Sequence, residues 1–172
     1  MTCPSQNTNF LSPNGFILTI ERLKNVAYFS QTVTLPSISL GELEQPTPLN
    51  RNSIPADQLQ WTPLIITFIV DSMMKNYIEI FKWMQGLGFP ENYNQYTTEM
   101  KTRVPPVAMD LPTNYSDASL TVIDAFDNPI KTFTFVDIWP MSLEGITFAT
   151  TNADVQYATS SVTFGYSYFK ID

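Results

Sequence analysis

Pairs of carboxylates are the residues of this sequence whose types and spacing could do chemistry. Glu42 and Glu44 lie two positions apart, and Asp124 and Asp127 flank a turn sequence. Acid–base catalysis by two carboxyl groups needs surroundings that push their pKa values apart, and neither pair has such surroundings. In an extended strand, Glu42 and Glu44 would share one face. We therefore interpret these carboxylates as surface charges rather than as catalytic groups.

Most other catalytic and metal chemistry is excluded by residue type. The chain has no histidine, and Cys3 is its one cysteine, which excludes His- or Cys-based zinc and haem sites and Ser-His-Asp catalysis. No dense run of oxygen ligands suits calcium, and "GLGFP" lacks the lysine of a phosphate-binding loop. We expect no catalytic residue, metal or cofactor. An enzyme site built from dispersed residues is the alternative that fold alone leaves open.

The composition favours a protein that buries its outer faces against other copies. The 172 residues suffice for one domain with a real core, and we expect a single domain over residues 1–172. Charged residues make up only 15% of the chain, against roughly 25% in an ordinary soluble domain. This leaves less polar surface to solvate a lone monomer. The net charge of −7 repels phosphate, so tight electrostatic binding to nucleic acid is not expected.

We expect no secretory signal in the N-terminal stretch "MTCPSQNTNF", since it has neither a basic start nor an apolar run. No stretch of the chain reaches the about 20 apolar residues that a membrane helix needs. We therefore expect a protein that is made in the cytosol and has no membrane partner.

Alternating apolar residues predict a strand near the start of the chain. In "FILTIERL", Phe16, Leu18 and Ile20 would lie on one face and Thr19 on the other. "KN" would form a turn, and "VAYFSQTVTLP" would be the antiparallel partner, so the sequence predicts a hairpin over residues 16–36.

Residues 37–61, "SISLGELEQPTPLNRNSIPADQLQW", form a long excursion that is rich in proline. Loops of this length are uncommon in compact domains and usually have a function. The apolar residues are spaced as anchors. Two interpretations remain open: an ordered loop over its own core, or an arm or extended hairpin that docks on a neighbouring subunit. The anchoring residues are Leu40, Leu43, Leu49, Ile54 and Leu59.

The middle of the chain predicts a buried strand followed by one amphipathic helix. "PLIITFIV" is apolar on both faces, which is typical of a central strand that is covered on each side. Asp71 or Ser72 could cap the helix, and Gly86 and Gly88 suit a left-handed final turn before Pro90. The apolar stripe of the helix is Met73, Met74, Tyr77, Ile80, Phe81, Met84 and Leu87.

The C-terminal part predicts further antiparallel strands. Residues 118–126 would pair with residues 130–139 across a turn at 127–129, and "SLEGITFAT" could add a short strand. The last and longest strand would span residues 157–171, with a bend or a close approach at Gly165. The predicted fold class is mainly β (α+β): an antiparallel β-sandwich or barrel with one amphipathic helix.

The sequence resembles the tail tube proteins of contractile-tailed bacteriophages of the T4-like group. The segment "FVDIWPMSLEGITFATTNADVQYATSSVTFGYSYF" carries the resemblance best. "NGFILTIERLKNVAYFSQTVTLPSISLGE" resembles the opening hairpin of the family and its exit through "LP". "NYIEIFKWMQGLGFP" resembles versions from phages of cyanobacteria and other marine hosts. The chain departs from the family in its longer N-terminus and its proline-rich middle.

The resemblance implies a structural virion protein without enzymatic activity. Members form hexameric rings whose sheets join into an inner barrel, and stacked rings make the inner tail tube through which DNA passes during ejection. The implied partners are other copies of the chain, the tail sheath protein, baseplate and tail terminator proteins, and the tape-measure protein and DNA without specific binding. Two alternatives stay open: a related ring protein, such as a baseplate tube initiator or a tail terminator, and a soluble β module that binds a small ligand.

This interpretation predicts which residues meet other subunits. A long, weakly charged last strand would be a hazardous free edge on a monomer, and closure of a ring would remove that edge. The predicted lumen carboxylates are Glu42 and Glu44. The predicted subunit-interface residues are Leu40, Leu43, Leu49, Ile54, Trp61, Val162, Phe164, Tyr166 and Tyr168.

Overall fold

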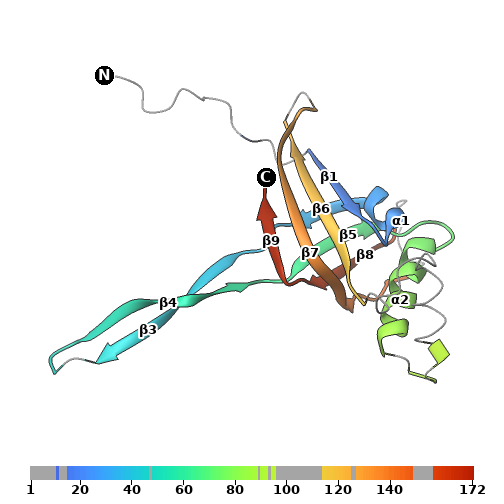
Figure 1. Ribbon diagram of the computed structural model, residues 1–172. Helices are drawn as coiled ribbons and strands as arrows, with labels where there is room; N and C mark the ends of the chain where they lie inside the picture. Colours follow the sequence, from blue (N-terminus) through green and yellow to red (C-terminus); the bar gives the residue numbers. More distant parts are fainter. Residues whose placement is uncertain are drawn as a thin grey trace, which may run out of the picture.

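The computed structural model describes residues 11, 15–46, 48–88, 90–92, 94–95, 114–124, 127–148 and 157–172. Within these residues the chain forms strands and two helices (Figure 1). In chain order the elements are β1 (Phe16–Ile20), α1 (Lys24–Tyr28), β2 (Ser30–Thr34), β3 (Ile38–Pro46), β4 (Arg51–Trp61), β5 (Leu64–Ile69), α2 (Lys75–Gly88), β6 (Ser116–Ile123), β7 (Pro129–Leu143), β8 (Thr159–Gly165) and β9 (Tyr168–Ile171).

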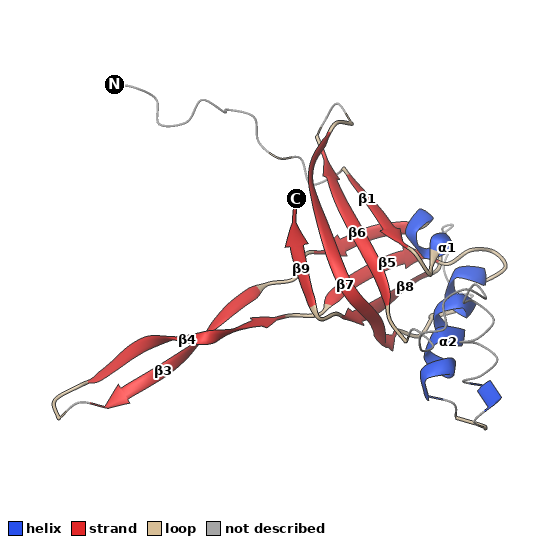
Figure 2. Cartoon of the chain, viewed as in Figure 1, coloured by secondary structure: helices blue, strands red, loops and turns tan. Residues whose placement is uncertain are grey.

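The strands of the body form two packed layers. The hydrogen-bonded order is β1-β6-β7-β8-β5-β2, with β9 also paired to β7, and every pair is antiparallel. Figure 2 shows β5 and β8 crossing behind β6 and β7, with both helices at one end of the strands. The predicted fold class, mainly antiparallel β with layered sheets, is confirmed.

The long strand β7 belongs to both layers. Its first half pairs with β6 and β9, and its second half pairs with β8 from Trp139 to Leu143. Between the halves lies Asp137, whose φ of 56° is left-handed and unusual for a residue with a side chain. A further register shift follows between Pro140 and Ser142. Such irregularities bend a strand, and here they let β7 turn from one layer into the other.

Apolar side chains from both layers fill the core. In β1, Leu18 and Ile20 are buried while Thr19 is exposed, which confirms the predicted alternation. Each fully buried aliphatic or aromatic side chain contributes about 1.5–3 kcal/mol. The fully buried large side chains are Leu23, Val26, Leu64, Ile66, Phe68, Ile80, Trp83, Phe135, Ile138, Val162 and Phe164, together with Ile20.

The hairpin predicted over residues 16–36 is wrong. The residues after β1 form the short helix α1, in which Val26 is fully buried. β1 pairs with β6, about one hundred residues later, and β2 pairs with β5. The "KN" step lacks the glycine that a two-residue hairpin turn usually needs. Local sequence therefore did not force the two strands together.

β5 is a central strand, as predicted, but only one of its faces is covered within the chain. Leu64, Ile66 and Phe68 are fully buried, whereas Ile65 is 42% exposed. The expectation of cover on each side is wrong for the isolated subunit. An apolar residue left at the surface of a central strand is a position that another chain can cover.

The predicted amphipathic helix exists, but its buried face is rotated. Ile80 and Trp83 are buried, whereas Phe81 is 52% exposed and Met73 is also exposed. The helix begins at Lys75 rather than beside a cap at residue 71 or 72. No described glycine has a positive φ, so the predicted left-handed final turn is wrong.

Asn76 fixes the start of α2 against β5. Its buried side chain donates a hydrogen bond from Nδ2 to Ile69 O at 2.7 Å and accepts one at Oδ1 from Asp71 N at 3.2 Å. A buried amide that satisfies both the strand end and the turn sets the direction in which the helix leaves the sheet.

The C-terminal pairing is confirmed in part. β6 and β7 form the predicted hairpin, but the described residues of "SLEGITFAT" add no strand beyond the end of β7. The single long last strand is wrong, because the chain bends after Gly165 and separates β8 from β9. Of the two alternatives predicted for Gly165, the bend is present. The atom that an added Cβ would meet, at 2.6 Å, is Trp139 Cζ2, which belongs to a side chain and not to another backbone.

Candidate assembly interface

Strands β3 and β4 form a long hairpin that extends away from the body, and we call residues 38–61 the arm (Figure 1). Its two strands pair with each other from Ile38↔Trp61 to Pro46↔Arg51. Nearly every residue of the arm is exposed, so the arm gains little from its own body. The predicted extended hairpin is confirmed, and the loop folded over its own core is wrong.

The root of the arm is fixed to the core. Trp61 packs edge-on against Phe169, with ring centroids 4.9 Å apart. Tyr166 donates a hydrogen bond from its hydroxyl to Thr62 O at 2.8 Å, and Ser37 N donates to Thr62 Oγ1 at the same distance. These contacts set the angle at which the arm leaves the sheet. Trp61 was predicted to meet another subunit, but within this chain it anchors the arm to its own body.

Apolar side chains on the arm are left open to solvent. Leu40 faces Leu59 across the strands, and Leu43 faces Ile54. All four are exposed, and Leu49 at the tip is 99% exposed. Paired apolar residues that no part of the subunit covers indicate a surface that binds another molecule. The sequence pointed to these five residues by their spacing but missed Ile38, which is also exposed beside the root.

The arm also carries acidic charge. By alternation along the regular part of the register, Glu42 and Glu44 share one strand face, and a register shift separates them from Leu40. Arg51 Nη1 lies 3.2 Å from Glu44 Oε2, in an exposed ion pair worth about 0–1 kcal/mol. Glu42 accepts a hydrogen bond from the Ser53 hydroxyl. The predicted shared face is present, and a place in a lumen stays a prediction for both glutamates.

The residues predicted on the last strand divide between core and surface. Val162 and Phe164 are fully buried within the subunit, and Tyr166 is 9% exposed. Their side chains pack in the core of their own subunit, so the expectation that they contact another subunit is corrected. Tyr168 lies beyond the bend and is 42% exposed, which leaves it accessible to a partner. The alternating pattern identified a shared face but not what that face covers.

The free strand edges of the body agree only in part with the predicted last strand, because its β9 part is an edge and its β8 part is not. β8 pairs on both sides, with β7 and β5. β1, β2 and β9 each pair on only one side within the described residues. The open backbone edges that another chain could extend therefore belong to these short strands.

Among the described residues, no group of three or more His, Cys, Asp or Glu side chains converges as a metal site. No helix in that part of the chain is long and apolar enough to cross a membrane. The described surface has an arm fixed to the core at its root, exposed apolar residues and unpaired strand edges. These are the features of an assembly interface.

Comparison with known proteins gives one curated relative over nearly the whole chain. The tail tube terminator protein of Enterobacteria phage T4 is 25% identical over 171 residues, which cover 95% of this chain and 90% of that protein. No family model matches the sequence.

Solved structures of contractile injection systems share the fold. The tube-terminating cap of the anti-feeding prophage aligns with a TM-score of 0.65 at 14% identity, over 96% of this chain and 93% of that one. The sheath/tube terminator structure of an extracellular contractile injection system aligns with a TM-score of 0.61 at 16% identity, over 96% and 99% of the two chains. A chain of the anti-feeding prophage baseplate gives 0.63 at 11% identity, over 96% of each.

Proposed function

We propose that this chain is a tube-like protein of contractile phage tails and, within that family, the tail tube terminator of a phage virion. In this role a closed ring of identical subunits sits at the end of the tail tube and ends its growth. The role is structural and needs no catalytic residue. The earlier expectation, a subunit of the tube itself, becomes the second candidate.

One observation carries the choice of the terminator. The T4 relative that is named a tail tube terminator aligns over 95% of this chain and 90% of its own length. The alignment therefore takes in the arm and both layers of the sandwich rather than one shared motif. The solved caps, terminators and baseplate proteins support the fold alone, because their identities are low.

The features of the subunit suit a ring. The arm and the free edges of β1, β2 and β9 are different surfaces, so contact between them is head-to-tail rather than self-complementary. Head-to-tail contacts close into a ring when the rotation between subunits divides a full circle. We propose six subunits, the number that the family resemblance implies.

The proposed surroundings are those of a tail. The ring would contact tube, sheath and neck or baseplate components of the virion, with the tape-measure protein and DNA in its lumen. The net charge of −7 favours passage of DNA over binding, because an acidic surface repels phosphate. Assembly in the host cytoplasm is part of the same proposal.

Negative-stain microscopy of the purified chain tests the function. A terminator should give closed rings that do not stack into long tubes, because one face of the ring must not bind another ring. Long stacked tubes would overturn the terminator in favour of a tube subunit. Single particles of monomer size at high protein concentration would contradict both roles and leave the soluble ligand-binding module.

A further inference from the structure

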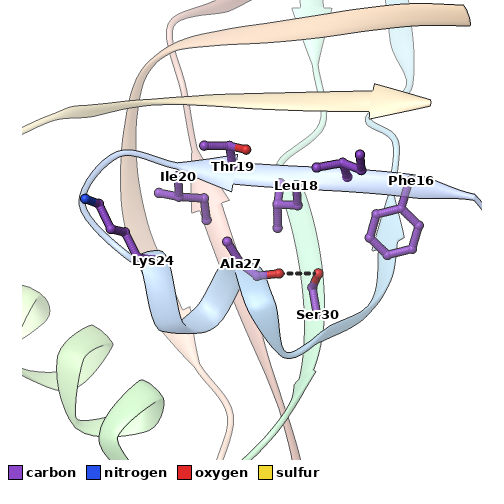
Figure 3. A pocket seen from close by; sticks show the side chains of 8 residues that line it. Phe16, Leu18, Thr19, Ile20, Lys24, Ala27 and Ser30 are labelled. Atoms are coloured by element: carbon purple, nitrogen blue, oxygen red, sulfur yellow. Dashed lines mark hydrogen bonds between the residues drawn. The ribbon is translucent and has the colours of Figure 1, made fainter. Parts of the chain in front are cut away.

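A groove runs along β1 on the body of the subunit. It has a volume of about 480 Å³ and is lined by the whole of β1 together with Lys24, Ala27 and Ser30 (Figure 3). Two of the lining residues are joined to each other, since the Ser30 hydroxyl donates a hydrogen bond to Ala27 O at 2.9 Å. Most of the lining side chains are apolar, so an extended segment laid in this groove would bury apolar surface.

The backbone edge of β1 that points away from β6 has no partner strand in the described part of the chain. At one end of the β1–β6 ladder, Glu21 N donates to Asp117 O at 3.2 Å. Since hydrogen-bonding direction alternates along an antiparallel strand, the backbone groups of Thr19 also face β6, whereas those of Leu18 and Phe16 face away from it. An added strand could therefore pair with β1 through its backbone.

The charges of the groove and the arm are complementary. Lys24 is the one charged residue in the groove lining, and no described carboxylate forms an ion pair with it. On the arm, Glu42 has a hydroxyl partner, Ser53, but no cationic partner among the described residues. The groove therefore carries one uncompensated cation, and the arm carries two carboxylates without a cationic partner among the described residues, Glu42 on β3 and Asp57 on β4.

The arm also supplies a suitable strand. β3 pairs only with β4 and has no proline between residues 38 and 45, whereas β4 contains Pro55, which cannot donate a backbone hydrogen bond. β3 presents Leu40 and Leu43, both exposed. Figure 1 shows the arm leaving the body on the side away from the helices. An arm cannot occupy a groove beside α1 of its own subunit from there, but the arm of a neighbour can.

We propose that the groove along β1 receives strand β3 of the arm of a second copy, with Glu42 of the arm facing Lys24. This inference rests on the proposed ring function and names its subunit contact. It assigns Glu42 to a junction between subunits rather than to the lumen. Each copy gives one arm and receives one, so the contact repeats around a ring.

A complementation experiment tests this contact with two variants that both keep the folded body of the subunit. The first, arm-deleted, lacks residues 39–60 and joins Ile38 to Trp61 through two glycines, since these two residues are direct partners in the register. The second is Thr19→Arg, which places a bulky side chain on an exposed position in the groove. Each variant alone should be monomeric in mass photometry. An equimolar mixture should give a 1:1 heterodimer that grows no further.

Two controls separate docking from misfolding. Thr19→Ser keeps the groove open and should assemble like the wild type. Lys24→Glu should weaken assembly at least tenfold, and adding Glu42→Lys in the same chain should restore most of that loss. Lys75→Glu makes the same charge change on the exposed surface of α2, outside the groove lining, and should assemble like the wild type.

The outcomes distinguish this contact from the ring itself. If the wild type forms rings and Thr19→Arg forms them equally well, or if the mixture stays monomeric, the groove is not the receiving site and the ring proposal stands. If the wild type never leaves the monomer, both proposals are overturned.

Discussion

Gly165 is the residue whose replacement should most clearly disturb the body of the subunit. An added Cβ would lie 2.6 Å from Trp139 Cζ2 and 3.1 Å from Met141 Sδ, which is too close for either neighbour to accept without moving. Gly165→Ala should therefore lower the free energy of unfolding by about 1–3 kcal/mol. Denaturant titration measures this, with Gly145→Ala as the matched control, because a Cβ there meets no atom within 4 Å. Equal losses for both variants would contradict the packing at Gly165.

Tyr166 links the core to the root of the arm, and its effect should depend on pH. Removing its hydrogen bond to Thr62 O in Tyr166→Phe should cost about 0.5–1.5 kcal/mol at pH 7. Burial raises the pKa of the Tyr166 phenol above its usual value of 10. The stability that the Tyr166 phenol contributes is therefore fully present below the pKa of tyrosine in the unfolded chain, near 10. It is lost as the pH rises through the higher pKa of the phenol in the folded chain.

The raised pKa of Tyr166 determines how the effect of Tyr166→Phe on stability should change with pH. The stability difference between wild type and Tyr166→Phe should stay constant up to about pH 10 and narrow above it. Unfolding curves at pH 8, 9, 10 and 11 measure the difference, and Tyr168→Phe, an exposed tyrosine, serves as the control. A gap that widens with pH would show that the phenol is not the group that titrates.

At the scale of the elements, the arm should be dispensable for folding and necessary for assembly. Its residues are almost all exposed, so the arm-deleted variant loses little buried surface. We expect its free energy of unfolding to stay within about 1 kcal/mol of the wild type, while its self-association is lost. Circular dichroism with denaturant measures the first and sedimentation velocity the second. An arm-deleted chain that still forms rings would contradict the role given to the arm.

The elements also show how far the sequence could predict this structure. Alternation predicted β1 and the β6–β7 hairpin, because a strand with one face in the core shows a period of two. The partner of β1 could not be predicted, since it is set by packing with β6 about one hundred residues away. Helix periodicity predicted α2, but two aromatic residues two positions apart left open which of them faces the core, and Trp83 rather than Phe81 is buried.

The candidate interface was predictable where it consists of local sequence. Length and proline content indicated an arm, and the arm exists with Leu40, Leu43 and Ile54 exposed. The same reasoning placed Val162 and Phe164 at an interface, although both are buried in their own core. An alternating pattern identifies the residues that share a face, but only the arrangement of the layers decides whether that face meets the core or a neighbour.

At the scale of the whole molecule, the low fraction of charged residues and the free strand edges both favour assembly with other copies of the chain. Only 15% of the residues are charged, and strands β1, β2 and β9 each keep one unpaired edge within the described residues. A monomer that leaves such edges open risks indefinite pairing with other chains. A closed ring pairs every copy in the same way and leaves no copy at an end.

Native mass spectrometry of the purified 172-residue chain tests closure of the ring most directly, because it counts the subunits in each complex. Our account predicts one dominant complex of six subunits at micromolar protein concentration, with few complexes of intermediate size. A spectrum of monomers alone, or a continuous series of dimers, trimers and larger open oligomers without a dominant closed species, would contradict it.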